Sequence, residues 1–384
     1  MTFIFQTPGK LIVEWGGAAR LGERVAYPFG DLRRLLMVTD KALRDACIAD
    51  PALASLSAAG FEVLVFDAVV ADPPEAVLRA CVELGRGFGA QGVIGFGGGS
   101  SMDVAKLAAL LLCTDQPLDG LYGIDKAKGD RLPLVQVPTT AGTGSEVTNI
   151  TILTTGGTTK MGVVSRQLYA DLVLLDAELT VGLPRIHTAA TGIDAMVHAI
   201  EAYTSRSRKN PLSDLFAREA LRLLSAHLVA ACEDGADRTA REAMLLGACY
   251  AGQAFSNSPV AAVHALAYPL GGHYHLPHGL TNALMLGPVL RFNMRAAAPL
   301  YAELADVVVG ASSAETTARA AAFVDHVQDL MNRSGAPRRL RDVGVPEESL
   351  PVLAADAMKQ TRLLTNNPVE VTEADALRLY QEAF

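Results

Sequence analysis

The pattern of apolar residues changes at Leu183–Pro184, and this change constrains the fold more than any other feature of the sequence. Before that point, short apolar runs alternate with helical patterns. A further pair of runs, at 151–155 and 160–164, flanks a glycine-rich turn and predicts a hairpin. The runs that predict buried strands are 34–40, 61–67, 91–97, 133–138 and 170–176, and 73–89 predicts an amphipathic helix. This alternation predicts a parallel sheet wound with helices.

After Leu183–Pro184 the strand signals stop, and long segments rich in Ala and Leu follow. These segments predict a second, helical domain that extends to the C-terminus. The sequence therefore predicts an α/β N-terminal domain over 1–184 and an all-α C-terminal domain over 185–384. The last helix is expected to begin after Thr372, because Asp375 three residues later resembles a capping box.

Composition excludes several classes of protein. The 384 residues are 50% hydrophobic and 19% charged, which is typical of a globular chain with a substantial core. A formal net charge of −8 argues against a nucleic-acid or anionic-membrane partner. The N-terminal segment lacks the features of a signal peptide, and the apolar run 107–113 is too short to cross a bilayer. Five scattered cysteines without C-x-x-C pairing predict reduced thiols in a cytoplasmic protein.

A glycine-rich loop, GFGGGSSMDVAK at 95–106, follows the third predicted strand. Glycines at a strand end let the backbone turn tightly, and the next helix presents free N–H groups, which together suit a pyrophosphate. The loop departs from G-x-G-x-x-G because Ser100 occupies the last position. A tight strand–helix turn without a ligand is the alternative interpretation.

A second loop, PTTAGTGSEVT at 138–148, follows the fourth predicted strand and offers the hydroxyls of Thr139, Thr140, Thr143 and Ser145. Two such loops on successive parallel strands favour a crevice for a dinucleotide over a simple turn rich in Ser and Thr.

Asp40 ends the first long predicted strand. A carboxylate in that place can accept a hydrogen bond from a ribose 2′-hydroxyl and repel a 2′-phosphate, which favours NAD over NADP. A helix N-cap is the alternative role for Asp40.

Metal-ligating residue types gather in the second half of the chain. Asp194 and His198 lie four residues apart in an apolar helical stretch, and therefore on one helix face. His264 lies in a second apolar stretch, and His278 follows a proline. One carboxylate and three imidazoles predict a site for a divalent transition-metal ion that stays open to substrate. A single buried histidine is more often a hydrogen-bonded core residue, but four such residues together favour the metal site.

The segment 264–279 holds half of the chain's 8 histidines. His273 and His275 flank Tyr274 in what the sequence predicts to be a partly exposed loop, and neither is needed as a ligand.

Four stretches, in this order, resemble the iron-containing (group III) alcohol dehydrogenase family: GFGGGSSMDVAK, PTTAGTGSEVT, GIDAMVHAIEAY and VHALAYPLGGHYHLPHG. The similarity extends from VEWG near the start to NNPVEVTEADALRLY near the end. The resemblance implies a dehydroquinate synthase-like fold, with a dinucleotide-binding α/β domain, a helical domain and a site in the cleft between them.

The resemblance also implies cofactors and site residues. The metal ligands would be Asp194, His198, His264 and His278, with Fe²⁺ as the usual ion and Zn²⁺ or others in some members. The family commonly forms dimers, with the first strand near the subunit contact, so a homodimer or higher homo-oligomer is expected. The NAD contacts would come from Asp40, Gly97, Gly98, Gly99, Ser100, Asp103, Thr139, Thr140, Thr143, Ser145 and Lys160.

One position departs from the family pattern. Many members carry a second histidine one helical turn after the third ligand, with a role in proton release or substrate placement, and here that residue is Tyr268. Tyrosine has a reference pKa near 10 and is a poorer proton relay at neutral pH. His275 or a chain of waters is the expected substitute.

The activity implied is hydride transfer between NAD and a primary alcohol or ω-hydroxy acid, with an aldehyde as the product. The main alternative is a hydroxyacid–oxoacid transhydrogenase that retains its nicotinamide. A lyase like dehydroquinate synthase shares the fold, but the basic residues that would hold a phosphate are not evident. A non-catalytic NAD-binding or assembly protein is disfavoured, because it would have no need for the complete set of four ligands.

Overall fold

The computed structural model describes residues 2–157 and 159–384, and these form two compact units. An α/β unit comprises Thr7–Thr140 and Gly144–Gly182. A helical unit comprises Ala141–Thr143 and Leu183–Phe384, together with the segment that ends at Gln6. The main division thus falls between Gly182 and Leu183, where the sequence places it between residues 184 and 185.

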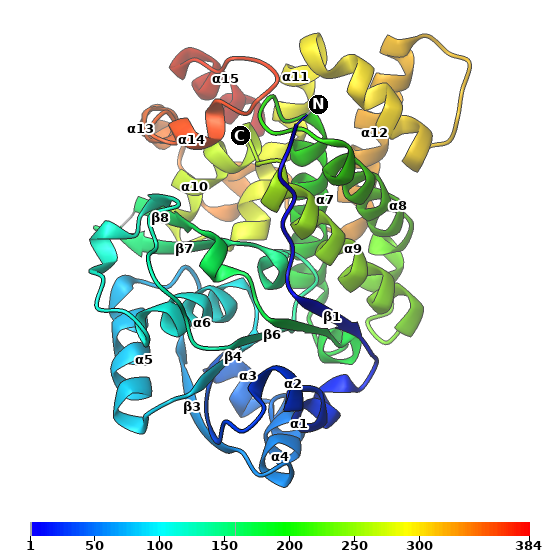
Figure 1. Ribbon diagram of the computed structural model, residues 1–384. Coiled ribbons are helices and arrows are strands. Elements are labelled where there is room, and N and C mark those ends of the chain that lie inside the picture. Colours follow the sequence, from blue (N-terminus) through cyan, green and yellow to red (C-terminus); the bar gives the residue numbers. More distant parts are fainter. Residues whose placement is uncertain (1, 158) are drawn as a thin grey trace. The chain divides into compact units, whose positions relative to one another are not determined.

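A six-stranded parallel sheet forms the centre of the α/β unit, as predicted (Figure 1). Its strands, in spatial order, are β1 (Lys10–Val13), β9 (Leu172–Leu175), β6 (Leu134–Pro138), β4 (Gly92–Gly97), β2 (Arg34–Asp40) and β3 (Glu62–Val69). All residues of β4, β6 and β9 are buried, because helices cover both faces of the sheet. This double burial explains why the strands read as continuous apolar runs and could be located from the sequence. The edge strand β1 is mostly exposed, and its apolar pattern did not identify it as a strand.

Alternate residues of each strand pack against different helices. Leu35 and Met37 of β2, with Ile94 and Phe96 of β4, share one core with the short helices on that face. Those helices are α1 (Leu21–Arg24), α2 (Ala26–Phe29), α3 (Lys41–Asp45) and α4 (Asp50–Ala58). The opposite face is covered by α5 (Glu75–Phe88) and α6 (Gly99–Leu111).

A second, smaller sheet contains β5 (Gly123–Ile124), β8 (Thr159–Val164) and β7 (Ile150–Thr155). Strands β7 and β8 pair antiparallel, with Thr155 opposite Thr159, and this confirms the predicted hairpin. The turn predicted from the sequence includes Thr158, which lies outside the described residues.

The helical unit contains no strand among its described residues, in agreement with the sequence. Its helices are α7 (Arg185–Thr204), α8 (Pro211–Glu233), α9 (Arg238–Asn257), α10 (Ala262–Tyr274), α11 (His278–Val308), α12 (Thr316–Ser334), α13 (Leu350–Ala357), α14 (Thr361–Leu364) and α15 (Glu373–Ala383). Helix α7 packs against α8, α9 and α11 and is buried on nearly every side. The predicted capping box is present at α15, where the N–H of Asp375 donates to the Thr372 hydroxyl and the N–H of Thr372 donates to the Asp375 carboxylate, both at 3.1 Å. Among the described residues, no helix has both the length and the hydrophobicity that a membrane crossing requires.

A fully buried lysine ties α6 to the loop that precedes β7. The Nζ of Lys106 donates to the hydroxyls of Ser145 at 2.7 Å and Thr148 at 3.0 Å, and to the carbonyl of Ile150 at 2.7 Å. Burial lowers the pKa of Lys106. These three oxygens, with Asp103 at 3.4 Å, compensate for much of the water that the ammonium loses on folding.

Glu146 lies in the same loop and is also buried. Burial raises the pKa of its carboxyl from the ordinary value of 4.5 to about 7. The folded protein therefore binds a proton at Glu146 over a pH range in which the unfolded chain has released it. It follows that the contribution of Glu146 to stability decreases as the pH rises from about 4.5 to about 7.

We expect Glu146→Gln to remove this pH dependence. Relative to the unmodified protein, the variant should gain up to about 3 kcal/mol in the free energy of unfolding between pH 4.5 and pH 8, since one pKa unit corresponds to about 1.4 kcal/mol. Urea unfolding followed by the fluorescence of Trp15, which belongs to the same α/β unit, measures it. Glu83→Gln, at an exposed position, is the matched control. A stability difference for Glu146→Gln that does not vary with pH would contradict the expectation.

Candidate functional site

Helix α7 presents a carboxylate and an imidazole side by side. Asp194 and His198 are one helical turn apart, and the Oδ1 of Asp194 lies 4.0 Å from the Nε2 of His198. Both side chains are buried, because α7 is surrounded by other helices. The helical spacing alone thus places two potential ligands on one buried face, as the sequence predicts.

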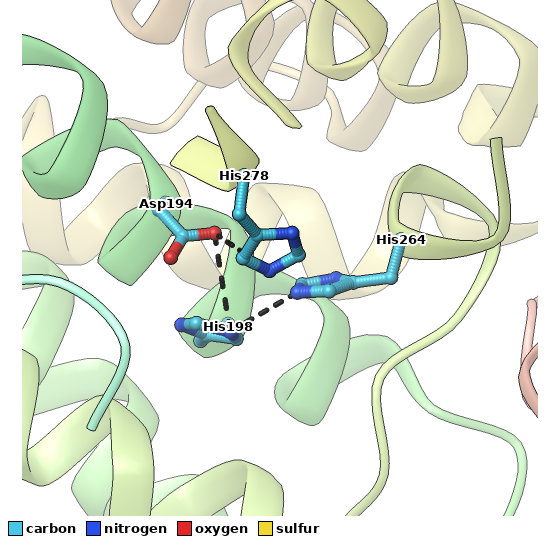
Figure 2. A group of neighbouring side chains, drawn as sticks. All are labelled: Asp194, His198, His264 and His278. Atoms are coloured by element: carbon cyan, nitrogen blue, oxygen red, sulfur yellow. Dashed lines mark hydrogen bonds and ion pairs between the residues drawn. The ribbon is translucent and has the colours of Figure 1, made fainter. Parts of the chain in front are cut away.

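Helices α10 and α11 bring two more histidines to this face (Figure 2). The Nε2 of His264 lies 3.0 Å from the Nε2 of His198, and the Nε2 of His278 lies 3.8 Å from the Oδ1 of Asp194. His278 is the first residue of α11, directly after Pro277. One ligand atom from each of the four side chains lies within 4.8 Å of every other. The structure therefore brings together all four residues predicted to bind a metal ion.

The protonation states of this cluster suit a cation. Burial lowers the pKa of His198 to about 3, so its ring is neutral at neutral pH. Burial alone would raise the pKa of Asp194, but the nearby imidazoles of His198, His278 and His264 and the amide of Asn282 together lower it. A neutral imidazole and an ionised carboxylate are the forms that bind a metal ion.

The donor set fits a divalent transition-metal ion. Two imidazole nitrogens that face each other at 3.0 Å cannot both use their lone pairs unless a proton or a cation lies between them. Three nitrogens and a carboxylate oxygen are ligands typical of iron or zinc.

Two residues that contact the cluster were missed by the sequence interpretation. Glu201 lies on α7 and bonds to the Nδ1 of His264 at 2.7 Å. The Nδ2 of Asn282 donates to the Oδ1 of Asp194 at 2.5 Å and lies 3.3 Å from the Nε2 of His278. Each lies at helical spacing from a predicted ligand, Glu201 three residues after His198 and Asn282 four residues after His278. That spacing on otherwise apolar helices is the signal that could have identified them.

Tyr268 lies beside the cluster, and His275 lies at the exposed end of α10. The Tyr268 ring centroid is 6.0 Å from that of His278 and 6.5 Å from that of His264. His275 is exposed and ends α10 with a left-handed backbone conformation at φ 54°. The predicted loop at His273 is wrong, because α10 continues through Tyr274. His273 belongs to the last turn of α10 and pairs with Asp356 at 2.5 Å.

The glycine-rich loop joins β4 to α6 within the α/β unit. Gly97 has φ 154°, and a Cβ there would lie 2.8 Å from the Cβ of Ser101, so the turn requires glycine. Helix α6 begins at Gly99, its N-cap is Gly98, and no side chain caps it. Ser100 follows in the first turn. The geometry is that of an anion-binding helix N-terminus, as predicted for the pyrophosphate.

The second loop begins beside the first. Gly97 is paired with Pro138 across β4 and β6, and the N–H of Thr139 donates to the carbonyl of Gly97 at 3.0 Å. An added Cβ at Gly98 would lie 3.7 Å from the side chain of Thr140. Residues 97–100 and 139–140 thus share the carboxyl end of two adjacent parallel strands, where α/β sheets bind nucleotides.

The remaining predicted cofactor residues make contacts inside the protein. Asp40 accepts from the N–H of Leu43 at 3.0 Å, so it serves as the N-cap of α3. The hydroxyl of Ser145 donates to Asp103 at 2.5 Å. These contacts do not identify a ligand. Lys160 is buried and pairs with Asp72 at 2.7 Å, and Thr143 belongs to the short segment Ala141–Thr143 of the helical unit.

Comparison with known proteins identifies a family. Residues 8–177 match the family model described as iron-containing alcohol dehydrogenase, and residues 188–384 match the model for the C-terminal part of the Fe-containing alcohol dehydrogenase family. The two matches together cover most of both units. They confirm the resemblance seen in the sequence.

Individual proteins of this kind are similar along the whole chain. Long-chain-alcohol dehydrogenase 1 of Geobacillus thermodenitrificans is 39% identical over 97% of this chain and 94% of its own length. A crystal structure of 1,3-propanediol oxidoreductase matches with a TM-score of 0.95 and 34% identity, covering 100% of both chains. The sulfoacetaldehyde reductase of Bifidobacterium kashiwanohense, solved in complex with NAD⁺, matches with a TM-score of 0.89 and 30% identity, covering 100% of this chain and 99% of that one. The two-part fold predicted from the sequence is confirmed by these structures.

Gly279 provides a test of how closely the cluster depends on helix packing. A Cβ at Gly279 would lie 2.6 Å from the carbonyl oxygen of Ala190 on α7, a backbone atom that cannot move alone. We expect Gly279→Ala to displace the start of α11 and separate His278 from Asp194. Overpacking typically costs about 1–3 kcal/mol, so divalent-ion affinity should fall about 10- to 100-fold.

Titration of the protein with Co²⁺ in competition with a chromophoric chelator measures this affinity. Gly287→Ala is the matched control on the same helix, because its Cβ would meet the flexible ends of two side chains, Gln328 at 2.9 Å and Arg291 at 3.5 Å, and no backbone atom within 3.5 Å. Equal affinities for the two variants would show that the site tolerates movement of α11.

Proposed function

Because this chain belongs to the iron-containing alcohol dehydrogenase family, we propose that it transfers hydride reversibly between a primary alcohol and NAD at a divalent metal ion. The observation that carries the proposal is the convergence of four side chains, of which Asp194, His198 and His264 are buried and His278 is partly exposed. When bound, the ion would polarise the substrate oxygen as a Lewis acid, and NAD would accept the hydride. Fe²⁺ is the ion proposed, with Zn²⁺ as the alternative.

The chain's own residues would bind and orient these groups. Asp194 would offset part of the ion's charge, and the three imidazoles would act as neutral donors. Residues 97–100 and 139–140 would hold the pyrophosphate of NAD through backbone N–H groups and hydroxyls. The phenol of Tyr268, beside His264 and His278, can both donate and accept a hydrogen bond, so we assign it the placement of the substrate hydroxyl.

The names of the relatives support an alcohol or aldehyde as substrate. The relatives named above act on long-chain alcohols, 1,3-propanediol and sulfoacetaldehyde, according to their names. Their common feature is an alcohol or aldehyde carbon that can exchange hydride with a nicotinamide. We therefore propose a primary alcohol or an ω-hydroxy acid for this chain.

Two properties of the whole protein are also proposed. The five cysteines are all free, although two of them are exposed, and this supports a reducing compartment such as the cytoplasm. The edge strand β1 exposes Leu11 and Val13, at 37% and 56%, and among the described residues no strand lies beyond it in the sheet. Such an edge supports a homodimer formed by pairing of strands, which sedimentation velocity would detect.

The proposed activity predicts iron-dependent formation of NADH. Chelator-stripped protein, mixed anaerobically with NAD and 1-butanol or 4-hydroxybutyrate, should produce NADH after Fe²⁺ is added and little without it. Absorbance at the NADH maximum measures the rate. No NADH from either alcohol, with hydride exchange between a hydroxy acid and an oxo acid in the absence of added NAD, would favour a transhydrogenase instead.

Removal of one metal ligand should distinguish the residues needed for catalysis from those needed for NAD binding. His264→Ala should reduce activity at least about a thousandfold, because Lewis-acid polarisation contributes several kcal/mol. Binding of NAD, measured by calorimetry, should change little, since His264 belongs to the helical unit and the proposed pyrophosphate loops to the α/β unit. Loss of NAD binding in this variant would contradict that division of roles.

A further inference from the structure

Glu201 contacts a predicted ligand but does not itself offer an atom to the metal cluster. We propose that Glu201 is a positioning residue of the metal centre, which sets the tautomer of His264 and anchors the start of α10 on α7. The inference rests on the proposed function and extends it to a residue outside the four ligands.

Both oxygens of the Glu201 carboxylate take part in hydrogen bonds. Its Oε2 accepts from the N–H of Ala261 at 2.9 Å and lies 2.7 Å from the Nδ1 of His264. Its Oε1 accepts from the N–H of Val263 at 2.7 Å. Glu201 is 4% exposed, so water contributes little to its solvation. Three N–H groups from one short segment thus replace that water.

The contact with His264 determines which ring nitrogen can bind a metal ion. A carboxylate is only an acceptor, so the Nδ1 of His264 must carry the proton in this hydrogen bond. In a neutral imidazole the Nε2 then has the free lone pair. That Nε2 faces His198 at 3.0 Å, within the cluster. Carboxylates that hold metal-binding histidines in this way also raise the basicity of the ring.

The same carboxylate fixes the helix that carries this ring. Ala261, the N-cap residue of α10, provides no side-chain cap, so the first N–H groups of α10 need another acceptor. Glu201 supplies it from α7, three residues after His198. A negative charge at a helix N-terminus is also favoured by the helix dipole. One side chain therefore fixes both the orientation of the His264 ring and the position of its backbone.

Glutamine at this position would test the need for two acceptor oxygens. An amide has one acceptor and one donor nitrogen, so in Glu201→Gln a buried NH₂ group must face a backbone N–H or the Nδ1–H of His264. We expect the affinity for Co²⁺, measured by chelator competition, to fall about 10- to 100-fold, as for other residues that orient a metal ligand. The visible absorption of bound Co²⁺ should change as well, because the His264 ring loses its fixed orientation.

A matched control separates this role from simple helix capping. Asp237 is the N-cap of α9, where it accepts from the N–H of Ala240 at 3.0 Å, and it is not a member of the cluster. Asp237→Ala should lower thermal stability, as loss of a cap does, but leave Co²⁺ affinity and absorption unchanged. If Glu201→Gln behaves in the same way as this control, Glu201 has a structural role alone and the proposal is wrong.

Two further outcomes keep the tests independent. If the unmodified chain binds no Co²⁺, the proposed metal centre fails, and the role of Glu201 fails with it. If Glu201→Gln does not fold, the tautomer can be read in the unmodified, metal-free protein from the imidazole ¹⁵N shifts of His264 at neutral pH. A signal from the form protonated at Nδ1 supports the proposal, and a signal from the form protonated at Nε2 overturns it.

Discussion

The buried carboxylate of Asp194 is the constraint on which the arrangement of the helical unit depends. A charge removed from water costs several kcal/mol unless other groups replace its hydration. Here the Nδ2 of Asn282 on α11 donates to the Oδ1 of Asp194 at 2.5 Å, and His198 on α7, His264 on α10 and His278 on α11 each bring a ring nitrogen within 4.8 Å of that carboxylate. Three helices must therefore keep a fixed mutual position. Close contact makes this possible, since Gly279 lets α11 approach the backbone of α7.

The α/β unit places its candidate ligand groups by a different principle. Parallel strands end at the same edge of a sheet, so the loops after β4 and β6 lie together without any charged pairing between them. The second loop also needs contacts that hold it against α6. The buried ammonium of Lys106 does this through Ser145, Thr148 and the carbonyl of Ile150. These hydrogen bonds of Lys106 do not involve the backbone N–H groups in the first turn of α6.

Most of the fold could be predicted from the sequence because its signals are local. Buried parallel strands read as apolar runs, and the helical half shows no such runs, so both parts were assigned correctly. The edge strand β1 was not predicted, because only half-buried and exposed residues form it. The last turn of α10 was not predicted, because Pro269 and two glycines usually indicate a loop. In the structure, burial in the helical unit favours a continued helix here. Local patterns do not contain such tertiary effects.

The candidate site shows the same limit more sharply. Asp194 and His198 are recognisable because both lie on one helix, but Glu201 becomes meaningful only when α10 is placed against it. Its helical spacing from His198 is a local signal, but only the packing of α10 against α7 shows that its carboxylate meets the ring of His264. The carboxylates of Asp194 and Glu201, both on this buried face, differ in what they contact. Asp194 is a member of the cluster, whereas Glu201 contacts the Nδ1 of His264, which points away from the cluster. The carboxylate of Asp194 is therefore placed to bind a metal ion, whereas that of Glu201 accepts hydrogen bonds from the start of α10.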